Sequence, residues 1–195
     1  MSKLLDPKST FLRSLVANNR PDLYNFKRWI FHPGMLFNSL EKWWGNQGIR
    51  SVPHEGLDLC SFEEENSSIK TLGPHTKIPA AFAGRIVKID QDFLGKSIYI
   101  SHEIFDDRGR QLYSAYGHTD PRDALNIGSQ VAEGETIAVV SQGSGKKTTI
   151  VPHLHITFAW IPVPIATHDL TWDNLGKNLS ITLIDPLSVL ELNSP

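Results

Sequence analysis

The sequence predicts a mainly β protein, an antiparallel and barrel-like sheet domain with a small helical cap at its N-terminus. From Gly48 onward, short apolar runs are broken by Gly, Asp and Asn, which is typical of an all-β domain. Residues 8–45 instead place apolar side chains at helical spacing and hold three of the five tryptophans. A chain of 195 residues with 40% hydrophobic content can bury one respectable core. We therefore predict an N-terminal helical segment over residues 1–47 and a β-domain over residues 48–195.

Three helices are expected within the N-terminal segment. The first begins at Ser9 or Thr10, the second at Pro21, and the third begins near Met35 and ends at Gly45. The apolar side chains of this short segment are too many to be hidden within it, so they need a partner surface. We interpret the segment as a cap on the β-domain. A lid over a substrate site is the alternative, because aromatic faces also stack on sugars and peptides.

Short strands separated by turn residues are expected in the rest of the chain, over residues 78–82, 85–90, 97–102, 112–116, 130–133, 136–141 and 180–184. Two longer connections interrupt them, a polar loop over residues 62–77 and a second stretch over residues 159–180. Loops of this length often carry function. We expect them to form the two walls of a cleft.

Composition excludes several classes of function. The chain has 19 basic and 21 acidic residues and no long run of either sign, which argues against nucleic acid or anionic lipid as a partner. A single cysteine, Cys60, cannot form an internal disulfide or a cysteine-based zinc site. We expect no membrane span and find no signal-peptide pattern at the N-terminus. The sequence gives no indication of the oligomeric state.

Two pairs of polar residues suggest a metal site. His153 and His155 are two apart in a strand-like run, so both point to one face. His54 and Asp58 are four apart, which also returns both side chains to one side. Two imidazoles and one carboxylate form a three-ligand set that leaves a fourth zinc position open for catalysis. His118, at the end of another strand-like run, brings a further imidazole. A His-x-His pair alone is equally typical of two ordinary sheet residues.

Taken together, these motifs resemble the lysostaphin/LytM-type zinc endopeptidases, whose pattern is His-x-x-x-Asp, then Tyr-x-His, then His-x-His. The resemblance extends over about residues 51–190 and includes Asp185-Pro186 near the end. It implies a zinc endopeptidase that hydrolyses peptide bonds, typically in the cross-links of bacterial cell-wall peptidoglycan. The residues it assigns are His54, Asp58 and His155 as zinc ligands, and His118 and His153 as catalytic residues.

The resemblance, rather than the spacing, assigns the metal to His155 and not to His153. Tyr116 precedes His118 by two residues in the strand-like run, so we expect the two side chains to share a face and Tyr116 to act as a hydrogen-bond donor. The family works at the cell envelope or outside the cell, but the missing signal pattern leaves a cytoplasmic location open.

Three alternatives compete with this interpretation. In a helix-borne peptidase site Glu55 would be the general base, but Gly56 and the absence of a second histidine at position 58 count against a helix. In the strand-borne site we expect Glu55 to point away from the cluster. Two histidines and a carboxylate also bind non-haem iron, although the two surplus histidines favour zinc. A catalytically inert binding or activator module of cell-wall remodelling is the third alternative. All five key positions are filled, which favours the enzyme.

Overall fold

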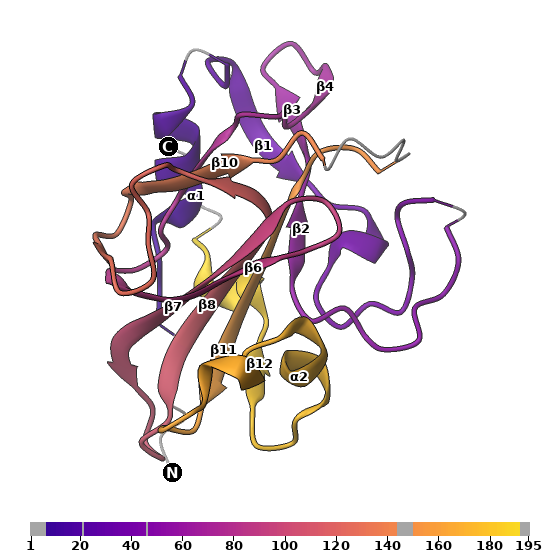
Figure 1. The fold of residues 1–195 in the computed structure, drawn as a ribbon. Coiled ribbons are helices and arrows are strands. Elements are labelled where there is room, and N and C mark those ends of the chain that lie inside the picture. The colour runs from indigo at the N-terminus through magenta and orange to yellow at the C-terminus, as the bar shows by residue number, and fades with distance from the viewer. Residues whose placement is uncertain (1–6, 21, 46, 144–149, 192–195) are drawn as a thin grey trace.

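The computed structural model of the protein describes residues 7–20, 22–45, 47–143 and 150–191, and antiparallel strands dominate this part of the chain (Figure 1). Three helices are present in it: α1 (Phe11–Asn18), α2 (Trp172–Lys177) and α3 (Pro186–Val189), with the 3-10 turns η1 (Pro33–Met35) and η2 (Thr167–Asp169). The first six strands are β1 (Phe26–Ile30), β2 (Leu57–Leu59), β3 (Ser61–Glu64), β4 (Ile69–Thr71), β5 (Lys77–Pro79) and β6 (Gly84–Gln91). The others are β7 (Lys96–Phe105), β8 (Gln111–Pro121), β9 (Gln130–Val131), β10 (Thr136–Val140), β11 (Leu154–Ile161) and β12 (Thr182–Ile184). The predicted fold class is confirmed.

The strands described form two sheets. A nine-stranded sheet runs in the order β12-β11-β8-β7-β6-β9, with β10 joining β8 to β5 and β2 added to β11. A three-stranded sheet has the order β1-β3-β4. All the strand pairs within both sheets are antiparallel. This arrangement matches the antiparallel prediction.

Strand β11 is an inner strand of the large sheet, with β8 on one side and β2 and β12 on the other. All eight of its residues are buried, because the sheet packs apolar side chains on both of its faces. One edge of β11 pairs with β8 from His155 to Ile161, while the other edge pairs first with β2 and then with β12. The His-x-His segment therefore enters a strand that has neighbours on both sides.

Helix α1 packs against β5 and belongs to the main core. Its apolar residues Phe11, Leu12, Leu15 and Val16 are all at most 7% exposed. The side chain of Asn19, just beyond the helix, accepts a hydrogen bond from the Lys77 amide (2.7 Å) and donates one to the Lys77 carbonyl (2.9 Å). The first predicted helix is confirmed, and it is bonded to the sheet.

The second and third predicted helices are wrong. Phe26–Ile30 forms strand β1, which pairs with β3, so that Phe26 and Trp29 pack their rings against Phe62 at 5.9 and 6.3 Å. The apolar spacing fits a helix, but aromatic residues also favour strands, and a partner strand with a matching ring decides between the two. The residues from Met35 to Gly45 have only the short turn η1 at their start.

The predicted polar loop over residues 62–77 is also wrong in its first half, where β3 and β4 form a hairpin. Glu63 lies in β3 opposite the basic residues of β1 and forms ion pairs with Lys27 and Arg28 at 2.7 and 2.6 Å. Cross-strand charge pairs of this kind make a polar sequence compatible with a strand.

Candidate metal centre

The strand register places Asp58 directly beside His155. Asp58 of β2 is the cross-strand partner of His155 of β11. On its other side, His155 is paired with Gly117 of β8. Directly opposed residues of an antiparallel pair have Cβ atoms about 4.5–5.5 Å apart and point to the same face. The pairing of β2 with β11 thus brings together two ligand candidates that are 97 residues apart in sequence.

His54 reaches the same point because Gly56 lets the chain pass close over β11. A Cβ atom built on Gly56 would lie 2.4 Å from the Ile156 carbonyl oxygen and 2.7 Å from His155 Nε2, distances that side chains do not adopt. Only glycine fits at this position. The segment is not helical, since β2 begins at the next residue. The helix-borne alternative is therefore excluded by the local structure.

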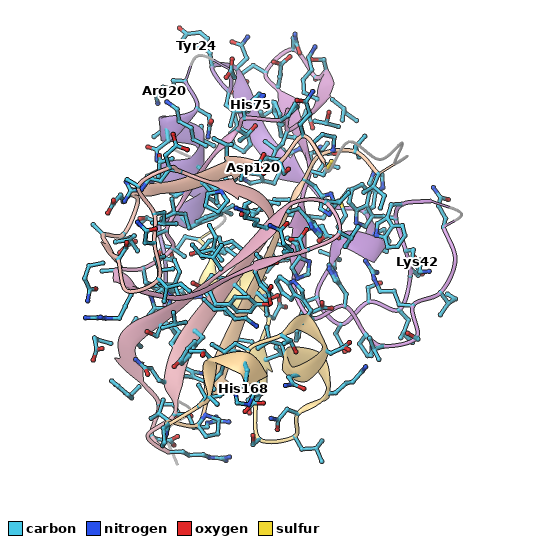
Figure 2. All side chains as sticks on the ribbon, viewed as in Figure 1. Arg20, Tyr24, Lys42, His75, Asp120 and His168 are labelled. Carbon is cyan, nitrogen blue, oxygen red and sulfur yellow. The ribbon has the colours of Figure 1, made fainter. Side chains whose placement is uncertain are left out.

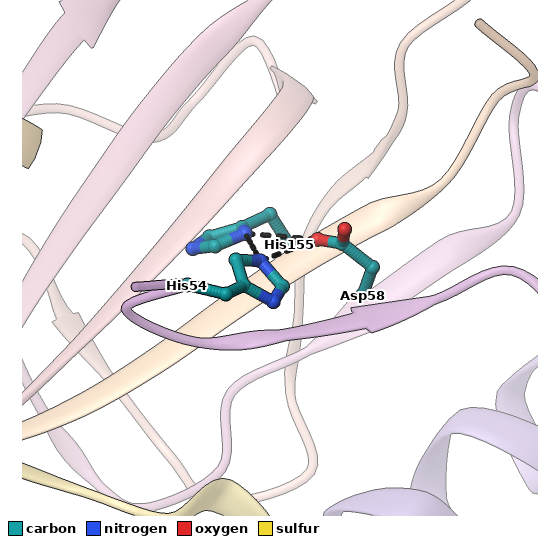
Figure 3. Close-up of side chains that lie close together, drawn as sticks. All are labelled: His54, Asp58 and His155. Carbon is teal, nitrogen blue, oxygen red and sulfur yellow. Dashed lines mark hydrogen bonds and ion pairs between the residues drawn. The ribbon is translucent and has the colours of Figure 1, made fainter. Parts of the chain in front are cut away.

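Three side-chain atoms converge at this point (Figure 3). Asp58 Oδ1 lies 3.3 Å from His54 Nε2 and 2.9 Å from His155 Nδ1, and the two nitrogens are 3.1 Å apart. Tetrahedral zinc with bonds of about 2.0–2.1 Å separates its ligand atoms by about 3.3 Å. The triangle and its donor types therefore fit a zinc ion with one position left open.

Hydrogen bonds on the outer side hold each of the three side chains in place. His54 Nδ1 lies 3.0 Å from the Leu36 carbonyl oxygen and His155 Nε2 lies 3.0 Å from the Thr157 hydroxyl. With protons on these two outer nitrogens, the two inward nitrogens would be free to bind a metal in place of their contacts with Asp58. Thr157 reaches the His155 ring because it lies two residues after His155 on the same strand face. Trp43 Nε1 donates to Asp58 Oδ2 at 2.6 Å. Such partners fix the tautomer and orientation that a metal needs.

The Asp58 carboxylate carries a negative charge. Burial alone would raise the pKa of Asp58, but the hydrogen bonds with His155 and His54 outweigh burial and hold that pKa well below its usual range. Burial alone would lower the pKa of His54, but the hydrogen bond with Asp58 overcomes it and raises the pKa of His54. The buried carboxylate is therefore ionised at neutral pH and attracts a cation.

His153 lies beside the cluster, with its ring in edge contact with Trp43 and its Nε2 atom 3.9 Å from Asp58 Oδ1. Its Nδ1 donates to the Val151 carbonyl (2.9 Å), which leaves the Nε2 lone pair directed inward. Burial lowers the pKa of His153 to about 4, so the ring is neutral near pH 7. The Nε2 lone pair is therefore free to accept a hydrogen bond or a proton.

His118 completes the group, with its ring centroid 4.8 Å from that of His153 and 6.2 Å from that of His155. It sits in a bulge of β8 and has a positive φ of 63°, a conformation that costs a non-glycine residue about 1–3 kcal/mol. Asp92 accepts hydrogen bonds from its backbone N–H (2.8 Å) and from its ring Nδ1 (3.2 Å). All five predicted site residues therefore lie together.

Tyr116 does not join them. It is fully buried in the main core, packs against Phe11 at 6.3 Å, and its hydroxyl accepts a hydrogen bond from the Ala81 amide (2.8 Å). The prediction that Tyr116 and His118 share a face is wrong, because the bulge between them shifts the alternation of side chains.

An open cavity of about 140 Å³ exposes the group to solvent. Its lining consists of Trp44, Arg50, His54, Glu55, Asp58, Phe93, His118, His153, His155 and Trp172. Trp172 comes from the stretch over residues 159–180, as expected for one wall, whereas residues 62–77 contribute nothing to the lining. Trp44 and Arg50 come from the stretch that precedes His54. Glu55 also lines the cavity, contrary to the expectation that it points away.

Four residues that contact the five site residues were not identified individually from the sequence: Trp43, Arg50, Asp92 and Trp172. Asp92 has the sequence signature of a turn residue, and nothing local links it to a histidine 26 positions later. Trp172 lies edge-on to His155 with ring centroids 4.7 Å apart, and Arg50 approaches Asp58 to 3.8 Å. Only the pairing of distant strands and loops makes these contacts.

The remaining histidines lie apart from the cluster. His75 and His168 are exposed at opposite ends of the view in Figure 2, and His32 is exposed as well. His102 is fully buried, between the Ala83 carbonyl and the Ser114 hydroxyl, and burial lowers its pKa to about 4. Cys60 is a buried free thiol. Among the described residues, no helix is both long and apolar enough to cross a membrane.

Comparison with solved structures gives three examples of similar chains. The solution structure of lysostaphin is 16% identical over 89% of this chain and 55% of its own, with a TM-score of 0.48. Lysostaphin from Staphylococcus simulans is 18% identical over 84% of this chain and 48% of its own, with a TM-score of 0.44. The catalytic domain of the prophage-encoded M23 protein EnpA from Enterococcus faecalis is 18% identical over 67% of this chain and 85% of its own, with a TM-score of 0.38. The protein thus spans about half the length of the lysostaphin chains.

No protein of known, curated function matches the sequence. The sequence profile of peptidase family M23, in contrast, matches residues 64–166, which include His118, His153 and His155. His54 and Asp58 precede the matched region and join it through the pairing of β2 with β11. Because the match covers more than half of the chain, the protein belongs to peptidase family M23, a family of hydrolases that act on peptide bonds.

Proposed function

We propose that the protein is a zinc-dependent endopeptidase that hydrolyses peptide bonds in the cross-links of bacterial cell-wall peptidoglycan. The observation that carries the proposal is the convergence of His54 Nε2, Asp58 Oδ1 and His155 Nδ1 beside two further histidines in an open cavity. Membership of the M23 family supports hydrolysis of peptide bonds. A peptidoglycan substrate would place its action at the cell envelope or outside the cell.

The zinc ligands in this proposal are His54, Asp58 and His155. Zinc bound there would polarise a substrate carbonyl and lower the pKa of a water molecule toward neutrality. Carboxylate and neutral imidazole are ligands that zinc prefers, and the three atoms leave one side of the triangle facing the cavity. The outer hydrogen bonds from Trp43 and to Thr157 keep this triangle rigid.

The catalytic residues in this proposal are His153 and His118. His153 presents an unprotonated Nε2 atom next to the cluster, so it accepts the proton of the attacking water. His118 donates its Nδ1–H to Asp92, and a carboxylate behind the ring stabilises positive charge on it. When Nε2 carries a second proton, His118 donates a hydrogen bond from that atom to the oxygen that becomes negative as the carbonyl is attacked. The Nε2 atoms of His153 and His118 thus perform the proton transfer and the hydrogen bonding from within one cavity.

The aromatic residues of the cavity would hold an extended peptide on either side of the scissile bond. Phe93 is 59% exposed and contacts the His118 ring edge-on at 4.7 Å, while Trp172 covers His155 from the other side. Flat rings provide contact area at low entropic cost. A peptide that is flexible and has small side chains, such as a cross-link, fits between them.

Digestion of purified peptidoglycan by the full-length protein tests this function. We expect new free amino groups and no new reducing sugar ends, because a peptidase cuts only peptide bonds. A chelator should abolish the release of amino groups, and added zinc should restore it.

If the zinc-loaded protein sediments with the peptidoglycan but releases no amino groups, the endopeptidase proposal fails and the inert binding module takes its place. The variant His153→Ala serves as the matched control, since it should bind the same material without cutting it.

A further inference from the structure

The turn between β6 and β7 contains a buried carboxylate that faces His118 from the side away from the metal cluster. The side chain of Asp92 is only 3% exposed. Its Oδ1 atom accepts hydrogen bonds from the backbone amides of Leu94 (2.8 Å) and Gly95 (2.7 Å) and from His118 Nδ1. Its Oδ2 atom accepts from the Ser97 hydroxyl (2.9 Å) and from the His118 amide. Each of these hydrogen-bond partners is a donor to the carboxylate.

Asp92 constrains both the backbone and the ring of His118 through two hydrogen bonds. The bond to the amide supports a backbone conformation with positive φ, which histidine rarely adopts by itself. The bond to Nδ1 sets the rotation of the ring and favours the tautomer with the proton on Nδ1. The Nε2 atom then carries the lone pair, or a second proton when the ring is charged, on the cavity side.

The hydrogen bonds continue from Asp92 to the far wall of the cavity. The Ser97 hydroxyl, which donates to Asp92, accepts a hydrogen bond from Trp172 Nε1 at 2.9 Å. Ser97 is 1% exposed, so this chain of bonds is shielded from water. Trp172 thereby helps to fix the orientation of the Asp92 carboxylate.

We propose that Asp92 is the positioning residue of His118: its carboxylate fixes the orientation and tautomer of the ring so that Nε2 faces the substrate. As a step in peptide hydrolysis, this inference rests on the function proposed above. The two active-site histidines then differ in the hydrogen-bond acceptor of Nδ1. It is the Asp92 carboxylate for His118 and the Val151 carbonyl for His153. Asp92 acts through His118 and does not itself touch the substrate.

The tautomer can be measured directly by NMR of isotope-labelled histidine nitrogens in the full-length protein, with the His118 signals assigned by their absence in His118→Ala. In the wild type we expect the proton on Nδ1, and this measurement is independent of any variant. In Asp92→Asn we expect a shift toward the Nε2–H form. A wild-type ring protonated only on Nε2, or an unchanged tautomer in Asp92→Asn, overturns the proposal.

Asp106 offers a matched control. It occupies the turn between β7 and β8, where its carboxylate accepts hydrogen bonds from the Arg108 and Arg110 amides and from Arg110 Nε. It lies at the opposite end of β8, roughly 20 Å from His118 at about 3.3 Å per residue. Asp106→Asn should lower the melting temperature as a lost turn carboxylate does, but leave the His118 tautomer as it is. A tautomer shift in Asp106→Asn would show a general loss of structure and overturn the proposal.

Turnover distinguishes positioning from a structural role. Asp92→Asn should lower kcat about 10²-fold, at the lower end of the range for general acid–base residues, with KM and metal content little changed. In a His118→Ala background the same substitution should have no further effect. An equal loss of kcat in both backgrounds would overturn the positioning role.

The NMR experiment and the digestion experiment have separate outcomes. If the tautomer shifts as expected but the protein cuts no peptide, positioning of His118 is upheld and the proposed function is what fails.

Discussion

Replacing His153 by alanine is expected to lower the turnover number for peptide hydrolysis by about 10²–10⁴-fold, the usual contribution of a positioned general base. The reason lies in its position, since Nε2 is directed at the cluster while Nδ1 is held by the Val151 carbonyl. Metal content should stay unchanged, because the donor triangle is complete without His153. Turnover is measured on a peptide substrate and metal by elemental analysis of the same sample. His118→Ala should have an effect of the same order.

An exposed histidine provides the control for these variants. His75→Ala should retain full turnover, since His75 is exposed on the surface (Figure 2) and does not line the cavity. Loss of metal in His153→Ala would mean that the roles of His153 and His155 are exchanged. Retention of full turnover in both His153→Ala and His118→Ala would contradict the proposed mechanism.

Removing the N-terminal segment, so that the chain starts near Gly45, is expected to destabilise the whole protein. Helix α1 places four apolar side chains in the main core, and fully burying each contributes about 1.5–3 kcal/mol. Their sum is comparable to the roughly 5–15 kcal/mol that stabilises a typical domain. The truncation would also remove the two hydrogen bonds between the Asn19 side chain and the backbone of β5. It would remove the hydrogen bond from the Ser9 amide to the Val189 carbonyl (2.9 Å) as well. Thermal denaturation measures the effect.

A single substitution tests the same point without truncation. Leu15 is fully buried, and Leu15→Ala should cost about 2–5 kcal/mol. A truncated chain with an unchanged melting temperature and raised turnover would contradict the cap and show a lid instead. The segment is better described as part of the fold than as a separable cap, because β1 also pairs with β3 of the β-domain.

Sequence patterns were sufficient where the relevant information is local. Short apolar runs between turn residues identified most strands of the large sheet. The spacing of His54 and Asp58 anticipated that both side chains reach one point. Strand β1 was predicted as a helix because its apolar spacing also fits a helix. Only the packing of Trp29 on Phe62 selects the strand.

The rest of the site depends on contacts that no local pattern contains. Asp92 has the sequence context of a turn residue, and its role follows from the antiparallel register of β6, β7 and β8, which brings it to His118. Tyr116 was misplaced because a bulge adds one residue to β8 and reverses the faces that follow it. Trp43 comes from a stretch of irregular backbone, where sequence periodicity gives no direction for a side chain.

Elemental analysis of the purified full-length protein tests the central claim most directly. We expect one equivalent of zinc per chain in the wild type and loss of that zinc in His54→Ala, because removing one nitrogen leaves two of the three protein ligands. A wild-type protein that takes up no zinc, or a His54→Ala variant with the same zinc content as the wild type, would contradict a metal centre at His54, Asp58 and His155.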